Sequence, residues 1–344
     1  MRTPSSPSSS GGRHRPTMRE VAERAGVNKS TVSRVLSGKN PMGASPGTAD
    51  AIRTAARELG YFVDPWAASL RTQRTRSIGV LLPRLTDTVL AMIFEAIEEV
   101  ATQSGYQALV ASTGDDADEQ RRRVSLLEGR RVDGLVITTA RTDDKHYLDE
   151  LRSRGLPFVL ANRAVGDHPV ARGDDRGGGA MATRHLLANG HRRIGIIAGA
   201  AYAATSADRT VGYRDALAEA EIDVDPRLIV ESGPHVDDGV HGGRRLLSVD
   251  PRPTAIFAVN DQIAVGAMAA IRDVGLKVGS DVAVVGYNDT PVSARLPIPL
   301  TSVQHPVRAI GRHAMQTLLD LLAGEQPTSV TFPVQLTVRA SSHP

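Results

Sequence analysis

Residues 17–38 constrain this chain most, because they have the pattern of two short helices joined by a tight turn. Small apolar residues such as Val21 form one face of the first predicted helix, and Gly26 permits the backbone to reverse after it. Asn28 is a favoured N-cap for a second helix over 29–37. The sequence therefore predicts a helix-turn-helix near this end of the chain.

The outer side of the second predicted helix carries hydroxyl groups and two cations. Cations suit phosphates and guanine edges, and hydroxyls suit phosphate oxygens and bases, so this mixture is typical of a helix that enters a DNA major groove. An ordinary helix pair with a solvated polar face has the same pattern, and these residues alone leave both interpretations open. If the motif reads DNA, the residues expected to contact it are Thr17, Asn28, Lys29, Ser30, Thr31, Ser33 and Arg34.

Charge is distributed unevenly along the chain. Residues 1–76 hold 13 Lys and Arg against 5 Asp and Glu, whereas the remaining 268 residues hold 28 against 33. A basic head on a mildly acidic body is expected of a protein that binds nucleic acid with one end. The first 16 residues are rich in Ser, Pro and Gly without an apolar centre, so they predict a disordered tail rather than a secretory signal, and a cytoplasmic protein.

The composition argues against several other classes of protein. The 344 residues include no cysteine, which excludes disulfides and thiolate metal sites, and no apolar run reaches the ~18 residues of a membrane helix. The ten histidines lack metal-binding spacing, and no serine lies in a G-x-S-x-G motif. The glycine run 177–179 lacks the Lys-Ser/Thr of a phosphate loop, so we interpret it as a helix start. We expect no enzyme, no catalytic residues, no metal and no cofactor.

The rest of the chain divides into a third helix and an α/β region. Ser45 and Pro46 predict a helix over 46–59, whose apolar residues, including Ala51 and Ile52, are expected to face the first two helices. From residue 77 onward, short buried strands alternate with amphipathic helices, which indicates parallel sheets covered on both faces. The predicted strands are Ile78–Leu82, Ala108–Ser112, Gly134–Thr138, Phe158–Ala161, Ile194–Ala198, Leu228–Glu231, Ala255–Val259 and Val282–Gly286.

Several motifs occur in one order along almost the whole chain. They include V-A-x-x-A-G-V-x-x-x-T-V-S-R-V-L in the helix pair, VDGLVI at 132–137, VNDQIAVGAMAAI at 259–271 and DVAVVGYND at 281–289. Together they resemble the lactose-repressor (LacI) family of transcription factors. The resemblance implies an all-α helix-turn-helix headpiece and an α/β core like that of type I periplasmic binding proteins, with two doubly wound parallel-sheet subdomains and a ligand cleft between them.

The resemblance also implies domain boundaries. The DNA-binding domain would take residues 17–63 after a tail over 1–16, with a hinge helix and linker over 64–76. The effector-binding and dimerisation domain would take 77–340. Its first subdomain would comprise about 77–160 and 291–323, and its second about 163–289 and 327–340.

Residues 64–71 are the candidate hinge. Asp64 and Pro65 suit the start of a helix that is too short to be stable alone. The resemblance implies that this helix folds when two subunits meet on the operator. Leu70 matches the leucine that the family inserts into the minor groove. Simple linker packing is the alternative for a lone leucine, and the resemblance favours insertion.

The ligand cleft is expected where the strands end. Ligands of doubly wound folds bind outside the carboxyl ends of the strands, and here these ends are rich in Asn, Asp and Arg, whose planar groups suit vicinal hydroxyls. Arg209 matches the family's effector-binding arginine, whereas Asp175 and Asp261 are interpreted as helix caps. The residues expected to bind the effector are Asp87, Val89, Leu90, Asn162, Arg209, Asn260 and Asn288.

The scarcity of aromatic residues at these positions limits the class of effector. Val89 and Leu90 replace an aromatic pair common in the family, and aromatic residues make up only 3% of the chain, which disfavours a planar purine. A small sugar, sugar phosphate or sugar acid is favoured instead. The chain is then a homodimeric repressor of a pseudo-palindromic double-stranded DNA operator, with no membrane partner.

Two other classes of protein are alternatives to this interpretation. A solute-binding protein of an importer would share the two-lobed core, but the helix-turn-helix and the lack of a signal peptide argue against it. A DNA-architectural protein would leave the cleft unused, so sugar binding would separate it from a regulator.

Overall fold

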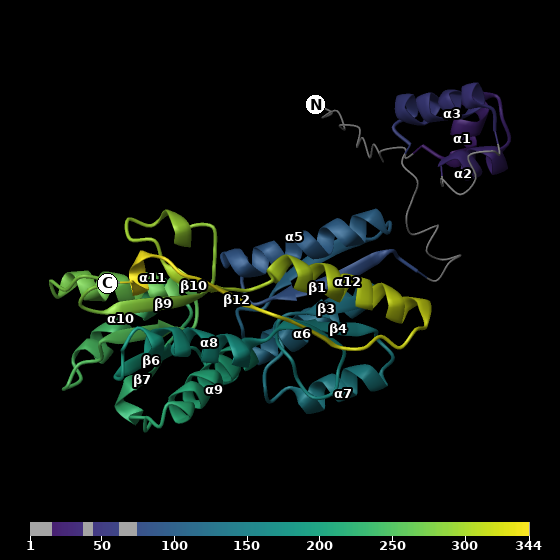
Figure 1. Ribbon diagram of the computed structural model, residues 1–344. Coiled ribbons are helices and arrows are strands. Elements are labelled where there is room, and N and C mark those ends of the chain that lie inside the picture. The colour runs from purple at the N-terminus through teal and green to yellow at the C-terminus, as the bar shows by residue number, and fades with distance from the viewer. Residues whose placement is uncertain (1–15, 37–43, 62–73, 344) are drawn as a thin grey trace, which may run out of the picture. The chain divides into compact units, whose positions relative to one another are not determined.

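The computed structural model describes residues 16–36, 44–61 and 74–343 (Figure 1). The chain forms two compact units, which meet in sequence between Thr75 and Arg76. Residues 1–15 of the expected tail and the candidate hinge over 64–71, including Leu70, lie outside the described residues. Within the described ranges, no helix is both long and apolar enough to cross a membrane.

The first unit is a three-helix headpiece made of α1 (Met18–Ala25), α2 (Lys29–Leu36) and α3 (Pro46–Leu59). Helix α1 starts with a capping box between Thr17 and Glu20, and its C-cap is Gly26, whose φ of 65° is left-handed. Val21, Val32 and Ile52 are fully buried where the helices meet. The three helices are those predicted, except that Ala51 is exposed, so the apolar face of α3 is narrower than expected.

The second unit contains two six-stranded sheets. The first sheet is entirely parallel and has the strand order β11-β5-β4-β3-β1-β2. Helices α5 and α12 lie on one side of it, and α6 and α7 on the other (Figure 1). An apolar cluster lies beneath each pair of helices. Its strands are β1 (Ser77–Leu82), β2 (Gln107–Ser112), β3 (Gly134–Ile137), β4 (Phe158–Ala161), β5 (Val170–Gly173) and β11 (Val330–Phe332), and its helices are α5 (Thr88–Gln103), α6 (Ala117–Gly129), α7 (Lys145–Ser153) and α12 (Val307–Ala323).

The second sheet has the order β12-β10-β9-β8-β6-β7 and is parallel except for β12, which runs antiparallel to β10. Helices α8 and α9 lie on one face, and α10 and α11 on the other, with one apolar cluster spanning the subdomain. The strands are β6 (Ile194–Ala198), β7 (Ile229–Glu231), β8 (Ala255–Ala258), β9 (Ala283–Asn288), β10 (Thr301–Gln304) and β12 (Gln335–Thr337), and the helices are α8 (Asp175–Ala188), α9 (Ala204–Glu219), α10 (Val236–Leu247) and α11 (Asp261–Asp273).

The subdomain boundaries differ from those expected from the sequence. Strands β5 and β11 belong to the first sheet, although residues 163–289 and 327–340 were assigned to the second subdomain. Strand β10 belongs to the second sheet, although residues 291–323 were assigned to the first. The chain therefore crosses between sheets after Gly173, after Gln304 and between Phe332 and Gln335. These strands have three or four residues each, too few for a clear periodic pattern.

The glycine run opens α8, as expected for a helix start, and it serves packing. A methyl group added to Gly179 would lie 2.2 Å from the carbonyl oxygen of Arg209, and one added to Gly212 would lie 2.0 Å from that of Arg176. The backbones of α8 and α9 therefore touch at this crossing, which only glycine permits.

Candidate ligand and DNA sites

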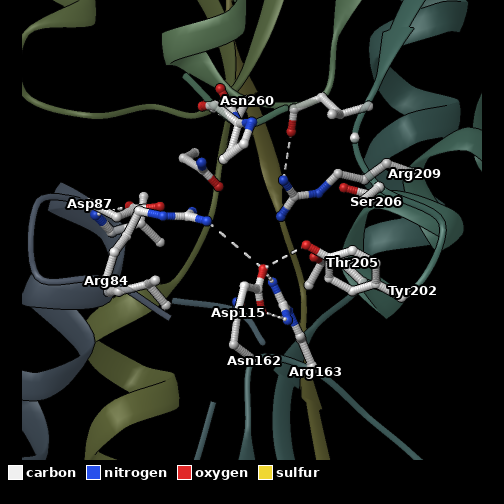
Figure 2. Close-up of a pocket in the computed structure, with 18 residues that line it drawn as sticks. Arg84, Asp87, Asp115, Asn162, Arg163, Tyr202, Thr205, Ser206, Arg209 and Asn260 are labelled. Carbon is white, nitrogen blue, oxygen red and sulfur yellow. Dashed lines mark hydrogen bonds and ion pairs between the residues drawn. The ribbon is translucent and has the colours of Figure 1, made fainter. Parts of the chain in front are cut away.

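One cavity collects all seven residues that were expected to bind the effector (Figure 2). It lies at the carboxyl ends of strands from both sheets and has a volume of about 100 Å³. Its lining comes from both lobes and includes Asp87, Val89, Leu90, Asn162, Arg209, Asn260 and Asn288. The topological rule for doubly wound sheets thus brings together side chains that are far apart in sequence.

Two of these residues also cap helices at the cavity wall. Asp87 accepts a hydrogen bond from the backbone N–H of Val89 at the start of α5 (2.9 Å), and Asn260 accepts one from that of Ile263 at the start of α11 (2.7 Å). The amide nitrogen of Asn260 donates to the carbonyl oxygen of Pro234. Asn260 is therefore oriented by the protein before any ligand arrives.

The interpretation of Asp175 and Asp261 as helix caps was wrong. Asp174, one residue earlier, caps α8 by accepting from the N–H of Gly177, and Asn260 caps α11. Asp261 is buried instead, where its carboxylate accepts hydrogen bonds from the hydroxyls of Thr290, Ser293 and Ser302.

Arg209 lies in the second turn of α9, and it is only 5% exposed. Its Nε donates to the carboxylate of Asp175 (2.8 Å) and its Nη1 to the carbonyl oxygen of Val259 (2.6 Å). The guanidinium also lies 3.6 Å from the ring centre of Tyr287. Burial raises the pKa of Asp175, and the charge of Arg209 opposes that shift.

A second buried ion pair lies in the first lobe and was not expected from the sequence. Arg163 makes two parallel hydrogen bonds to Asp115, of 2.7 and 3.0 Å, and Arg84 lies 3.9 Å from the same carboxylate (Figure 2). Burial raises the pKa of Asp115, but the hydrogen bond and charge of Arg163 outweigh it, so the pKa lies below its usual value. Asp115 follows β2 with a φ of 63°, and its place at a strand end was the available signal.

Tyr202 is an aromatic residue of the cavity that the sequence analysis missed. It follows β6 in the second lobe, yet its hydroxyl donates to Asp115 of the first lobe (3.2 Å). Its ring lies 3.9 Å from the guanidinium carbon of Arg141, and its carbonyl oxygen accepts from the N–H of Thr142. Tyr202 therefore joins the two lobes beside the cavity, and we call these contacts the interlobe clasp.

The residues of α2 that were expected to contact DNA differ in their exposure. Asn28, Lys29, Ser30 and Arg34 are exposed, while Thr31 and Ser33 are half-buried. The Arg34 side chain lies along the helix, where its Nε donates to the carbonyl oxygen of Ser30 and its Nη2 to the hydroxyl of Thr31. Thr17 is exposed and caps α1.

Among the described residues, Asp149, Asp167 and His168 are close enough together to be considered for a metal ion. However, Nη2 of Arg152 lies 2.6 Å from Nδ1 of His168, which must therefore accept a hydrogen bond. The proton is then on Nε2, which lies 3.2 Å from Asp149 and has no lone pair left for a metal. Burial lowers the pKa of His168, consistent with a neutral ring in a structural contact.

Two family comparisons fit these two units. The family of bacterial regulatory proteins, lacI family, matches residues 17–64, and the family of periplasmic binding proteins and sugar binding domain of LacI family matches residues 75–340. The chain belongs to the LacI family. It is a DNA-binding transcriptional regulator with an effector-binding domain of the sugar-binding type.

Relatives and solved structures match nearly the whole chain. The HTH-type transcriptional regulator CelR of Thermobifida fusca is 35% identical over 342 residues, which cover 96% of this chain and 99% of that protein. A CelR–cellobiose complex is similar in structure, with a TM-score of 0.73, 32% identity and coverage of 95% and 100%. The Lac repressor dimer bound to operator and the anti-inducer ONPF has a TM-score of 0.86 at 29% identity, covering 96% and 100%.

Proposed function

We propose that this regulator is a homodimeric repressor whose affinity for a pseudo-palindromic operator is controlled by a neutral sugar bound in the cavity. The exposed side of α2, with Lys29, Ser30 and Arg34, supports base reading in the major groove. The similar Lac repressor structure is a dimer on its operator, which supports the assembly. Leu70 and the hinge over 64–76 stay a prediction, in which the leucine enters the minor groove of the bound operator.

The proposed class of ligand rests on one observation, which is that every arginine in the cavity wall lies beside a carboxylate. Arg84 and Arg163 lie within 4 Å of Asp115, and Arg209 is paired with Asp175. Asp87 adds a third carboxylate, so three positive charges face three negative ones. A phosphate or carboxylate on the ligand would compete with these buried ion pairs, whereas hydroxyl groups can use the donors and acceptors that remain. This balance favours a neutral sugar over the sugar phosphate or sugar acid that the sequence left open.

The test is a thermal-shift series on the full-length protein with cellobiose, ribose, gluconate and glucose 6-phosphate. A ligand that binds only the folded state raises the melting temperature. We expect a neutral sugar to raise it and the two charged compounds to leave it unchanged. A larger shift with gluconate or glucose 6-phosphate would contradict the neutral class, and no shift with any sugar would contradict sugar control.

The sign of the response follows from operator titrations with and without the sugar that binds. An effector changes operator affinity only through a difference in its affinity for the two states of the protein. We expect the sugar to weaken operator binding, and the operator to weaken sugar binding by the same factor. Equal sugar affinity with and without operator would show that the cavity does not control DNA binding.

A further inference from the structure

His305 is a buried histidine at the crossover from β10 to α12, behind the cavity wall. Its Nε2 lies 2.9 Å from Oδ1 of Asn162, which lines the cavity. Each of the two residues belongs to a γ-turn. Asn162 is the central residue of one, in which the N–H of Arg163 donates to the carbonyl oxygen of Ala161. His305 is the first residue of the other, in which its carbonyl oxygen accepts from the N–H of Val307. The two side chains are therefore held against each other by backbone that has little freedom.

The surroundings of the imidazole decide which nitrogen carries the proton. Nδ1 of His305 is buried and has no hydrogen-bond partner among the described residues. A methyl group built on Gly173 would lie 2.4 Å from Cε1 and 2.7 Å from Nδ1, so an α-hydrogen of Gly173 faces this edge of the ring. A C–H group facing a lone pair is tolerated, whereas an N–H at this position would be a buried donor without an acceptor. The proton is therefore on Nε2.

The charge state of the ring agrees with this tautomer. Burial, with a contribution from the positive charge of Arg209, lowers the pKa of His305 well below its usual value. The imidazole is neutral and donates through Nε2 to Oδ1 of Asn162, which accepts. The amide of Asn162 then cannot rotate without replacing this hydrogen bond by a contact between two donors.

We propose that His305 is a positioning residue that fixes the amide of Asn162 so that only its NH2 group faces the ligand. This inference rests on the proposed function, because it takes the cavity as the sugar site. At this position the site then offers only a hydrogen-bond donor. The site therefore selects a ligand that has an acceptor oxygen there. An aspartate at position 162 would accept from His305 with one oxygen and present the other to the ligand, which reverses the polarity of this point.

The first experiment needs no ligand. The ¹⁵N chemical shifts of His305 in the full-length protein distinguish the protonated nitrogen from the bare one, and the resonance is assigned by its absence in His305→Gln. We expect the proton on Nε2. A proton on Nδ1 would overturn the proposal, because Asn162 would then present its oxygen to the cavity.

The second experiment measures ligand preference with cellobiose and analogues in which one hydroxyl at a time is replaced by fluorine, which accepts hydrogen bonds but cannot donate them. At one hydroxyl position, we expect the parent to bind the fluorinated sugar with nearly unchanged affinity. Asn162→Asp should lose about tenfold or more in affinity for this sugar, since fluorine then faces a carboxylate. His305→Phe frees the amide, which can still turn its NH2 group toward fluorine, so this variant should lose less affinity for the fluorinated sugar than Asn162→Asp does. His305→Gln supplies an N–H and should match the parent.

The outcomes separate the two proposals. Asn162→Asp with the parent's order of preference over the whole fluorinated series would overturn the role of His305 and Asn162. If cellobiose does not bind the parent, the choice of cellobiose as ligand is wrong, and the tautomer measurement still decides the orientation of the amide.

Discussion

Arg209 brings a charge to the cavity wall that the fold has already neutralised. Its pair with Asp175 is almost completely buried, so removing one partner leaves the other without compensation. We predict that Arg209→Ala lowers the free energy of unfolding by about 3–5 kcal/mol at pH 7. The double variant Arg209→Met/Asp175→Leu should recover most of this loss. Chemical denaturation of the parent, the single variant and the double variant measures both effects.

The same variant has a defined pH dependence. Without Arg209, burial outweighs the smaller lowering effects of Tyr287 and Arg172 and raises the pKa of Asp175 above the unfolded value, so the folded state binds the proton more tightly. Stability lost at neutral pH should therefore return as the pH falls toward the unfolded pKa of about 4. A deficit that is independent of pH between 7 and 4 would mean that the loss comes from packing and not from the unpaired carboxylate.

Arg34 is the residue of α2 best suited to a bidentate contact with guanine. We predict that Arg34→Ala weakens operator binding by about 1–3 kcal/mol and relaxes specificity at one position, mirrored in both half-sites. Arg53→Ala on α3, which removes an exposed arginine paired with Asp50, is the matched control and should leave specificity unchanged. Binding-site selection with randomised operators tests both. An equal loss of affinity for operator and random DNA would make Arg34 a phosphate contact only.

Helices α8 and α9 depend on glycine where they cross. A side chain at position 212 would meet the backbone carbonyl oxygen of Arg176 at 2.0 Å and the backbone nitrogen of Ala180 at 2.6 Å. We predict that Gly212→Ala destabilises the core by about 3 kcal/mol, because neither backbone can yield without separating the helices. Gly129→Ala is the control, since this last residue of α6 has open space around it and the substitution should change stability by less than about 0.5 kcal/mol. Equal thermal denaturation of the two variants would contradict close packing at the crossing.

Substitutions of Tyr202 test whether the interlobe clasp contributes to ligand binding. Tyr202→Phe keeps the ring against Arg141 but loses the hydrogen bond to Asp115, whereas Tyr202→Ala loses both. We predict that sugar affinity falls about 2–10-fold in Tyr202→Phe and further in Tyr202→Ala, because the ligand must then close the lobes unaided. Hydrogen exchange at the Thr142 amide, which donates to Tyr202, should speed up in Tyr202→Ala. Unchanged exchange there would show that the clasp does not hold the lobes together.

At the scale of the whole molecule, the sequence predicted the strands that have a local pattern of apolar residues. The eight predicted strands are all present, because runs such as 78–82 are continuously buried and apolar. The four remaining strands are short and were not predicted from the sequence. Without them, the order in which the chain passes between the two sheets could not be predicted either. The seven cavity residues could be found from strand ends. Tyr202 and Asp115 could not be paired, because their contact depends on how the lobes meet, which no local pattern encodes.

The two units should respond differently to salt, because one is basic and the other holds a charge-balanced cavity. Phosphate contacts release counterions, so the logarithm of operator affinity should fall linearly with the logarithm of salt concentration, with a slope of about −0.9 for each phosphate contact. A neutral sugar releases no ions from the paired arginines, and its affinity should change less than about twofold between 50 and 300 mM salt, since buried pairs are poorly screened. Titrations of operator and of the bound sugar over this range check both statements on one preparation. A sugar affinity that falls steeply with salt would show that the ligand is charged, and an operator affinity independent of salt would show that the basic headpiece does not contact phosphates.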